Sequence, residues 1–269
     1  MKAELGIAEE AAREAGALIR ASTTLDIRHK GVVDLVTQVD LACEEAIRKT
    51  LARHTPAIPV LAEEGGGATS ATTRWIVDPL DGTTNFVHGY PSYAVSIALQ
   101  VDGVLEVGCI YDPVHDAAYT ARNGHGAWCG ERRLNVSAPC TLQSALLVTG
   151  FPYDRAERID FYLGVVRAFL LAAQGLRRAG AAAMDFVALA SGSVDGYWEF
   201  GLNPWDVAAG VLLVEEAGGR VSDMDGSAFD LDNPRMLASN GSVHEDMLAV
   251  LSPLLLTSER GLDGHLGRN

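Results

Sequence analysis

The chain has 269 residues and a formal net charge of −14, and 48% of its residues are hydrophobic. This length and composition are typical of a globular protein with a full hydrophobic core. An acidic chain without a clustered basic face is a poor binder of phosphate backbones, so we expect no nucleic-acid partner. No apolar run reaches the roughly 18 residues of a membrane helix, so we expect no membrane partner. The four cysteines lie far apart, which favours reduced thiols and a cytoplasmic location.

Two amphipathic helices are predicted near the N-terminus. Across residues 3–21, apolar side chains recur at three- and four-residue steps. A second helix follows Thr37, because Thr37 and Asp40 have the spacing of a capping motif. A short strand at 60–61 then leads into residues 63–67, where three glycines predict an irregular loop with acidic residues at its edge.

The rest of the chain changes between strand and helix patterns in blocks. A hairpin is predicted around Asp102-Gly103, and the absence of strict βαβ alternation favours an α+β fold over a doubly wound parallel sheet. We predict one domain over residues 1–256, with closely joined halves of about 1–150 and 151–256, and a loose tail at 257–269. The predicted strands are 75–77, 93–100, 104–111, 117–122, 146–149, 220–222 and 236–238, and the predicted helices are 158–173, 181–190, 205–217 and 243–251.

The strongest chemical signal is a pair of aspartates at the end of a predicted strand. Asp78 and Asp81 stand three residues apart, and Pro79 and Gly82 fix the turn between and after them. We expect Asp81 to cap a short helix that follows. The amides of Gly82 and Thr83 at its start would then stabilise an anion. Carboxylates for a cation and amides for a phosphate thus meet at one turn.

Two aspartates cannot complete the octahedral oxygen shell of Mg²⁺. The candidate further ligands are Glu63 and Glu64 on the glycine-rich loop, and Asp206 at a helix start. Taken singly, each acidic residue has an ordinary explanation as a turn, cap or solvated loop residue. Only the set of them supports a functional hypothesis.

Together these segments resemble the inositol monophosphatase family in order and spacing. The resemblance spans about residues 6–251 and implies a layered α-β-α-β-α sandwich of the sugar/inositol phosphatase type. It also implies a lithium-sensitive homodimer. The segments that carry it are Asp34-Leu35-Val36-Thr37-Gln38-Val39-Asp40, Glu63-Glu64, Asp78 to Phe86, Trp205-Asp206-Val207-Ala208-Ala209-Gly210 and Glu216-Ala217-Gly218-Gly219.

The resemblance implies two or three Mg²⁺ ions per active site. Glu63, Asp78 and the carbonyl of Leu80 match the family's ligands of the first ion. Asp78, Asp81 and Asp206 match those of the second, and a third, weaker site involves Glu63 and water.

Catalytic and substrate-binding roles are also implied by the resemblance. Thr83 and Asp40 match the pair that orients the attacking water, with Glu64 behind them, so no nucleophilic serine or cysteine is needed. Glu199 matches a residue that binds a hydroxyl of a sugar-like substrate. The substrate-binding residues implied are Gly82, Thr83, Thr84, Gly180, Ala182, Glu199 and Lys30.

The expected reaction is hydrolysis of a small-molecule phosphate ester. The run from Thr83 to Phe86 looks like the inositol branch, which favours inositol 1-phosphate as substrate. Relatives that cleave adenosine 3',5'-bisphosphate, fructose 1,6-bisphosphate or histidinol phosphate remain alternatives, as does a non-catalytic regulatory protein. Ala181 departs from the family pattern by lacking a hydroxyl, and Arg178 could favour a second phosphate.

Overall fold

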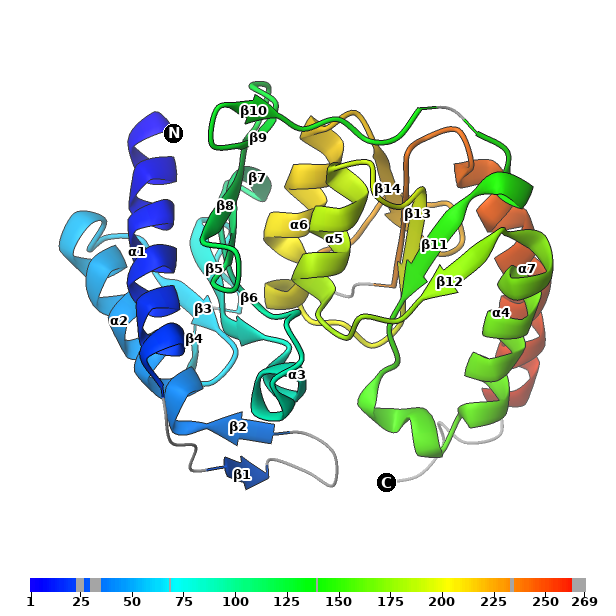
Figure 1. Ribbon diagram of the computed structural model, residues 1–269, viewed down its shortest axis with the longest axis horizontal. Coiled ribbons are helices and arrows are strands. Elements are labelled where there is room, and N and C mark those ends of the chain that lie inside the picture. The colour runs from blue at the N-terminus through cyan, green and yellow to red at the C-terminus, as the bar shows by residue number, and fades with distance from the viewer. Residues whose placement is uncertain (23–26, 30–34, 68, 139, 233–234, 263–269) are drawn as a thin grey trace.

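Helices and sheets alternate in five layers across the molecule (Figure 1). The computed structural model describes residues 1–22, 27–29, 35–67, 69–138, 140–232 and 235–262. In this part of the chain, two large sheets lie between three pairs of helices, in the order α-β-α-β-α. The predicted α+β sandwich is therefore confirmed.

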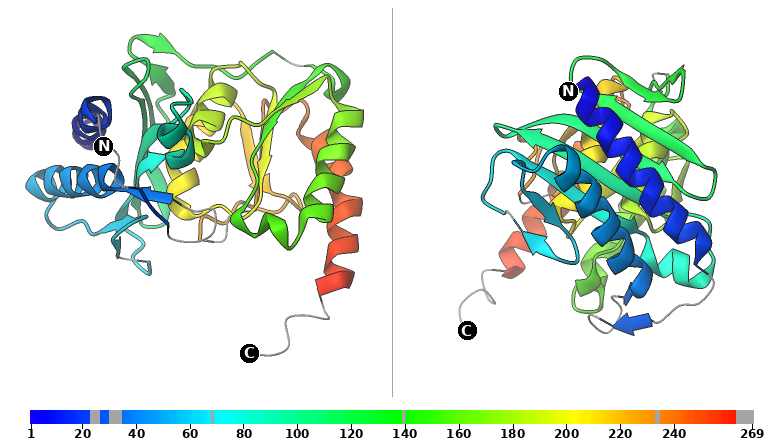
Figure 2. Two further views of the ribbon diagram at one scale, coloured as in Figure 1. Left: turned by 60° about the horizontal axis from the view of Figure 1, so that its bottom comes forward. Right: turned by 90° about the vertical axis from the view of Figure 1, so that its left-hand side faces the viewer.

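The first layer consists of α1 (Lys2–Ala21) and α2 (Gln38–His54), which lie side by side over one face of the first sheet (Figure 2). The buried stripe of α1 is mostly alanine, so the helix comes close to the sheet. A side chain at Gly16 would overlap the ring of Tyr111, which explains the glycine. The strands of the first sheet, in spatial order, are β10 (Arg132–Arg133), β9 (Ala127–Cys129), β8 (Ala117–Arg122), β7 (Val104–Asp112), β6 (Ala94–Val101), β5 (Arg74–Asp81), β3 (Val60–Ala62) and β4 (Gly66–Gly67).

The middle layer consists of α5 (Ala182–Ala190) and α6 (Pro204–Glu216), between the two sheets. Every residue from 207 to 214 is buried, as expected for a helix covered on all sides. A Cβ atom at Gly108 would lie 2.9 Å from the carbonyl oxygen of Ala209. Glycine on β7 thus allows α6 to pack directly on the first sheet.

The second sheet and the outer helix pair form the remaining layers. Strand β11 runs parallel to both of its neighbours, and the other pairings are antiparallel. The ring of Phe169 stacks on Trp198 with 4.1 Å between centroids, which joins the outer helices to this sheet. In spatial order the strands are β12 (Gly175–Arg177), β11 (Leu146–Thr149), β13 (Gly196–Glu199), β15 (Met236–Ser239) and β14 (Arg220–Asp223), covered by α4 (Ile159–Ala172) and α7 (His244–Leu262).

Short elements complete the described chain. The small sheet of β1 and β2 lies beside α3 at the lower edge of Figure 1. None of the helices in the described ranges is both long and apolar enough to cross a membrane. The short elements are β1 (Ile27–His29), β2 (Leu35–Thr37), α3 (Thr83–His88), η1 (Leu142–Ser144) and η2 (Tyr153–Ala156).

Several predicted elements differ from the structure. Residues 66–67 pair with β3 as a two-residue strand, because even glycine backbones can form ladder hydrogen bonds. The last helix continues to Leu262, so it includes the first six residues of the predicted tail at 257–269, and Leu254 and Leu255 pack against the outer core. The strands β1, β2, β9, β10, β12 and β13 were not predicted, since short strands give little periodic signal.

Candidate active site

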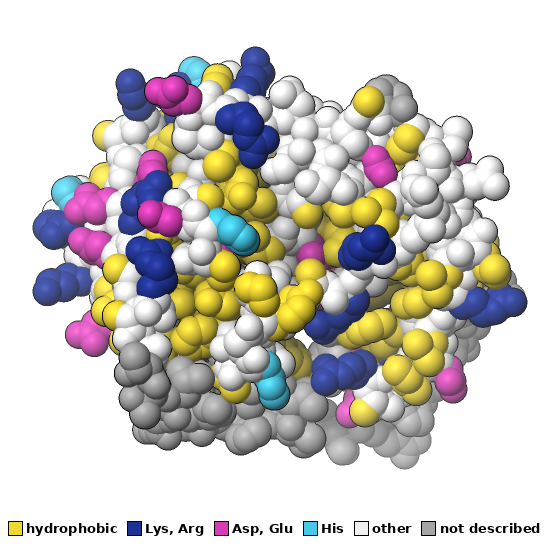
Figure 3. Space-filling model, in the orientation of Figure 1, with side chains coloured by type: hydrophobic (Ala, Val, Ile, Leu, Met, Phe, Trp, Pro, Cys, Tyr) yellow, Lys and Arg dark blue, Asp and Glu magenta, His cyan; other side chains and the backbone are white. Residues whose placement is uncertain are grey.

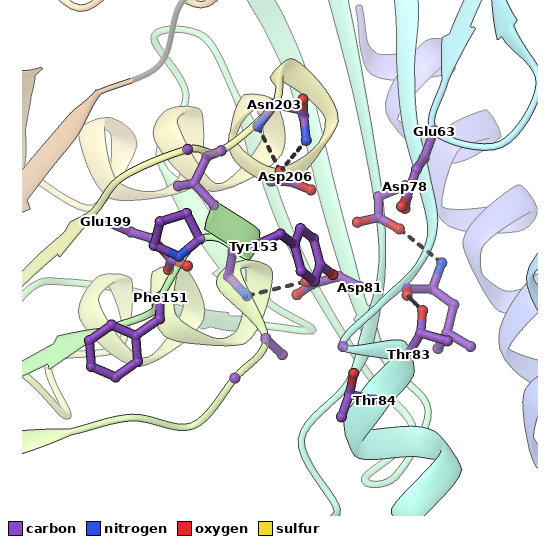
Figure 4. A pocket seen from close by; sticks show the side chains of 18 of the residues that line it. Glu63, Asp78, Asp81, Thr83, Thr84, Phe151, Tyr153, Glu199, Asn203 and Asp206 are labelled. Carbon is purple, nitrogen blue, oxygen red and sulfur yellow. Dashed lines mark hydrogen bonds between the residues drawn. The ribbon is translucent and has the colours of Figure 1, made fainter. Parts of the chain in front are cut away.

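The candidate site is a cavity of about 460 Å³ between the first sheet and the second half of the chain (Figure 4). The end of β5 and the start of α3 form one wall, and η2, α5, the end of β13 and the start of α6 form the other. The cavity therefore joins segments that lie far apart in sequence. The predicted site residues that line it are Glu63, Asp78, Leu80, Asp81, Gly82, Thr83, Thr84, Gly180, Ala182, Glu199 and Asp206.

The end of β5 carries the two predicted aspartates. The register with β6 shifts between Asp78 and Asp81, so the strand bulges where Pro79 stands. The amide of Leu80 donates to Asp78 Oδ1 at 3.0 Å, which leaves Asp78 Oδ2 directed toward the cavity (Figure 4). Gly82 follows with φ +85°, a left-handed conformation that turns the chain into α3.

Asp81 does not cap α3, contrary to the prediction. The N-cap of α3 is Gly82, which has no side chain with which to cap the helix. The Asp81 carboxylate instead accepts from the amides of Ala182 at 3.2 Å and Ala183 at 2.8 Å, at the start of α5. Its two partners are thus 101 and 102 positions away in sequence, and Asp81 connects the two walls of the cavity.

Thr83 and Asp40, which the resemblance implies as a water-orienting pair, are in contact. Thr83 Oγ1 lies 2.9 Å from Asp40 Oδ1 and 3.0 Å from the carbonyl oxygen of Leu80. Asp40 is fixed by its capping box, in which the amide of Thr37 donates to Oδ2 at 2.8 Å. Because the Thr83 hydroxyl has one proton and two acceptors beside it, its own lone pairs remain able to accept from a water in the cavity.

Glu63 and Glu64 follow β3 on a loop that α2 holds in place. Glu44 accepts from the amides of Glu64 at 2.9 Å and Gly65 at 3.0 Å. Arg48 donates to Glu44 at 2.7 Å and to the carbonyl of Gly66 at 2.7 Å. Sequence reasoning missed this support, although Glu44 and Arg48 stand at helical spacing behind Asp40.

Asp206 enters the cavity from the first turn of α6. The amide of Asn203 donates to Asp206 Oδ2 at 2.7 Å, and the Asn203 side chain adds a longer contact at 3.3 Å. These contacts use one carboxylate oxygen, and the other faces the cavity (Figure 4). The predicted helix start is confirmed, and it aims Asp206 at Asp78 and Glu63 from the opposite wall.

The carboxylates lie close enough to repel one another. Burial, followed by the charges of Glu63, Asp81 and Asp206, raises the pKa of Asp78 well above its usual value. Burial likewise raises the pKa of Asp81 to about 7, although the amides of Ala183 and Ala182 oppose that rise. Burial and the charge of Glu63 raise the pKa of Asp206. Such a concentration of buried negative charge is stabilised by divalent cations.

The donor chemistry fits Mg²⁺. The residues at the end of β5, with Glu63 and Asp206, offer only oxygen atoms, which is the ligand type of this hard cation. No three His, Cys, Asp or Glu side chains in the described ranges stand in a ready-made metal-binding group.

Glu199 forms the opposite end of the cavity, at the end of β13. The residue is 8% exposed, and its carboxylate accepts from the hydroxyl of Tyr197 at 2.6 Å. Burial raises the pKa of Glu199 to about 7, while the Tyr197 hydroxyl and the charge of Arg178 oppose that rise. Any Cβ on Gly150 would overlap this carboxylate.

Not every predicted residue reaches the cavity. Among the described residues, Asp40 and Glu64 lie behind its wall, and Asp40 acts on it only through Thr83. Lys30 lies outside the described residues. Sequence reasoning missed the lining residues Phe151, Pro152, Tyr153, Arg155, Gly201, Leu202 and Asn203, most of which follow the ends of β11 and β13, where loops that carry function are expected.

The fold and the acidic site agree with those of a known family of phosphatases. The model of the inositol monophosphatase family matches residues 2–255. Nus factor SuhB of Pseudomonas aeruginosa is 43% identical over 265 residues, which cover 95% of this chain and 98% of that protein. Inositol-1-monophosphatase of Synechocystis is 42% identical, over 92% of this chain and 88% of that protein. The chain belongs to the inositol monophosphatase family.

Solved structures agree with this assignment. Inositol monophosphatase from Anabaena has a TM-score of 0.86 and 42% identity, over 94% of this chain and 96% of that one. An IMPase/NADP phosphatase solved in complex with Mg²⁺ and phosphate has a TM-score of 0.79 and 26% identity, over 89% of this chain and 90% of that one.

Proposed function

We propose that the protein is a Mg²⁺-dependent phosphatase that hydrolyses a small polyol phosphate monoester, with inositol 1-phosphate as the leading substrate. The names of the Synechocystis and Anabaena relatives support the substrate class. The Mg²⁺ in the solved IMPase/NADP phosphatase supports the cofactor. The products would be the free polyol and inorganic phosphate.

The residues that would hold Mg²⁺ are Glu63, Asp78, Asp81, Asp206 and the carbonyl of Leu80, in two or three sites. When bound, Mg²⁺ supplies charge neutralisation at the phosphoryl and leaving oxygens and lowers the pKa of water. The amides of Gly82 and Thr83 would orient the phosphoryl oxygens, and Glu199 would accept from a substrate hydroxyl. A buried carboxylate is suited to that task because it recognises a hydroxyl strongly in a water-poor site.

The contact between Thr83 and Asp40 carries the proposal. The 2.9 Å contact lets Asp40 accept the hydroxyl proton of Thr83. The Thr83 oxygen then accepts a hydrogen bond from the attacking water, which directs a lone pair of the water at phosphorus. A protein that only binds a phosphate ester gains nothing from such a pair. Glu64 would act behind this pair by keeping the loop of Glu63 in place.

The first test is phosphate release from a panel of esters with Mg²⁺ or with EDTA. We expect Mg²⁺-dependent turnover, highest on inositol 1-phosphate. Thr83→Ala should lower kcat at least about 100-fold with a smaller change in KM, and Thr83→Ser should recover most of the rate. A higher rate on fructose 1,6-bisphosphate, adenosine 3',5'-bisphosphate or histidinol phosphate would change the proposed substrate but leave the proposed mechanism unchanged.

A second candidate is a regulatory role through a partner, because the Pseudomonas aeruginosa relative carries the name Nus factor SuhB. Asp81→Asn separates the two functions. If a cellular phenotype of gene deletion is restored by this variant while hydrolysis is lost, the regulatory role is the essential one. Loss of both would favour the enzyme.

We further propose a cytoplasmic, lithium-sensitive homodimer, as the family resemblance implies. Light scattering coupled to size-exclusion chromatography measures the oligomeric state. Phosphate release at increasing LiCl, with KCl as the matched salt, measures the inhibition.

A further inference from the structure

Helix α3 carries the proposed phosphate-binding amides at its start, although all six of its residues keep part of their surface exposed. Two contacts attach it to the first half of the chain. Thr83 Oγ1 lies 2.9 Å from Asp40 Oδ1, and the ring of Phe86 packs edge-on against Tyr93 with 5.4 Å between centroids. Its start faces the cavity, which Figure 3 shows as a hollow between the two halves of the molecule. The position of such a helix depends on a few single contacts.

Asn85 attaches α3 to the segment before α5, 94 positions away. Its side-chain Nδ2 donates to the carbonyl of Ser92 at 2.7 Å and to the carbonyl of Ala179 at 2.9 Å. Carbonyl oxygens can only accept, so both contacts require the nitrogen of the amide and use its two N–H groups in full. One side chain therefore holds the turn after α3 and the loop before α5 together.

The backbone beside this contact is closely packed. A Cβ on Gly82 would lie 3.0 Å from the Cβ of Ala181, and one on Gly180 would lie 3.4 Å from the side-chain amide of Asn85. The turn that would bind the phosphoryl group and the loop that would contact the polyol therefore touch at this point. A small shift of the loop changes the distance between the two binding regions.

Asp81 provides the other link between these segments, through the amides of Ala182 and Ala183. Asp81 is also a proposed Mg²⁺ ligand, so this link is part of the metal site. Asn85 carries no charge and, among the described residues, lies behind the lining of the cavity. Its link to Ala179 therefore fixes the loop independently of the cation.

We propose that Asn85 is a positioning residue, which sets the distance between the amides of Gly82 and Thr83 and the substrate-binding loop of residues 180–182. This inference rests on the proposed function, since it takes the phosphate and polyol regions of that function as given. Without the Asn85 amide, the phosphoryl group still binds at α3, but the polyol meets a displaced loop. A misplacement of about 1 Å can lower a rate about 100-fold.

The test is Asn85→Ala with inositol 1-phosphate as substrate and inorganic phosphate as inhibitor. We expect KM to rise about tenfold and kcat to fall about tenfold, because the polyol is misplaced relative to the attacking water. The inhibition constant of inorganic phosphate should stay within about twofold, since the contacts of Thr83 and Phe86 still hold α3. Asn85→Gln keeps the amide on a longer side chain and should recover part of the KM.

The matched control is Asn123→Ala. Asn123 is exposed, and its side chain donates to Glu106 at 3.3 Å, so its loss should leave KM, kcat and phosphate inhibition unchanged. An unchanged KM in Asn85→Ala would overturn the positioning role. So would an equal loss of inositol 1-phosphate and phosphate affinity, because that result means that α3 itself has moved.

Hydrogen exchange tests the contact without any turnover. The backbone amides of residues 179–183 should exchange about tenfold faster in Asn85→Ala than in the wild type, as for the loss of one hydrogen bond that holds a loop. Equal exchange rates would contradict the proposal. If the wild-type protein hydrolyses no ester, the proposed function fails, and the exchange rates alone decide whether Asn85 holds the loop.

Discussion

At the scale of single residues, Gly150 shapes the substrate end of the cavity by having no side chain. The carboxylate of Glu199 occupies the space in which a Cβ on Gly150 would stand. Tyr197 then fixes that carboxylate from the other side through its hydroxyl, at 2.6 Å. The position of the proposed hydroxyl acceptor therefore depends on a buried glycine as much as on Glu199 itself.

We expect Gly150→Ala to displace the Glu199 carboxylate and to raise the KM for inositol 1-phosphate several-fold. The cost in stability should be within about 1–2 kcal/mol, because the displaced atoms are the end of a flexible side chain. Steady-state kinetics and urea unfolding measure the two effects. The control is Gly164→Ala, which has no atom near the added Cβ and lies within α4, so it should leave KM unchanged and stabilise by about 0.5–1 kcal/mol. An unchanged KM in Gly150→Ala would show that Glu199 does not position the substrate.

At the scale of elements, α2 organises one wall of the site with a single face. Asp40, Glu44 and Arg48 stand four residues apart, so their side chains lie one above the other. Asp40 contacts Thr83, Glu44 accepts from the amides after Glu63, and Arg48 holds the carbonyl of Gly66. The water-orienting pair and the ligand loop are thus positioned by the same helix.

We expect Glu44→Ala to free the loop of Glu63 and to raise the Mg²⁺ concentration for half-maximal activity about tenfold. The variant leaves two amides without their acceptor, so the free energy of unfolding should fall by about 1–3 kcal/mol. Activity against a Mg²⁺ titration separates these effects from a general loss of folded protein. Glu45→Ala, one position along on the exposed face, is the control. A normal Mg²⁺ response together with reduced thermal stability would mean that Glu44 has only a structural role.

The helices and strands that could be predicted from the sequence are those with a clear local pattern of apolar and capping residues. Helices with a capping box and a long apolar stripe, such as α2, were predicted within a residue or two, as was the β6–β7 hairpin. By contrast, β12 and β13 pair in parallel with β11, and those pairings are set by contacts from distant parts of the chain. The acidic residues of the site were predicted because they stand in short local motifs. The cap that Asp81 provides to α5 and the position of Arg155 were not predicted, because both depend on contacts between distant segments.

At the scale of the whole molecule, a buried histidine joins the second sheet to the last helix. The imidazole of His244 at the start of α7 is fully buried, 2.9 Å from the hydroxyl of Ser222 on β14 and 2.9 Å from that of Ser239 on β15. Burial, followed by the charge of Arg220, lowers the pKa of His244 to about 4, against a smaller opposite effect of Glu245. The folded protein therefore holds this imidazole neutral.

The free energy of unfolding should fall as the pH falls from about 6.5 to 4. In that window the unfolded chain binds a proton at residue 244 that the folded chain does not, which costs up to about 3 kcal/mol at pH 4. His244→Gln should remove this part of the pH dependence. Urea unfolding of both proteins at several pH values gives the difference profile, in which the contributions of the buried carboxylates cancel. Parallel profiles for the two proteins would contradict the neutral imidazole.

The central position of α6 has a consequence for biosynthesis. The first sheet is complete once residue 133 has been made, but the helix that covers its inner face ends only at Glu216. At roughly 5–20 residues per second, a ribosome needs on the order of ten seconds to make the missing stretch. During that time one apolar face of the first sheet is uncovered in the nascent chain. The aspartates at the end of β5 also lack the opposite wall of the cavity. Throughout this interval, apolar surface that α6 buries in the folded protein has no cover of its own.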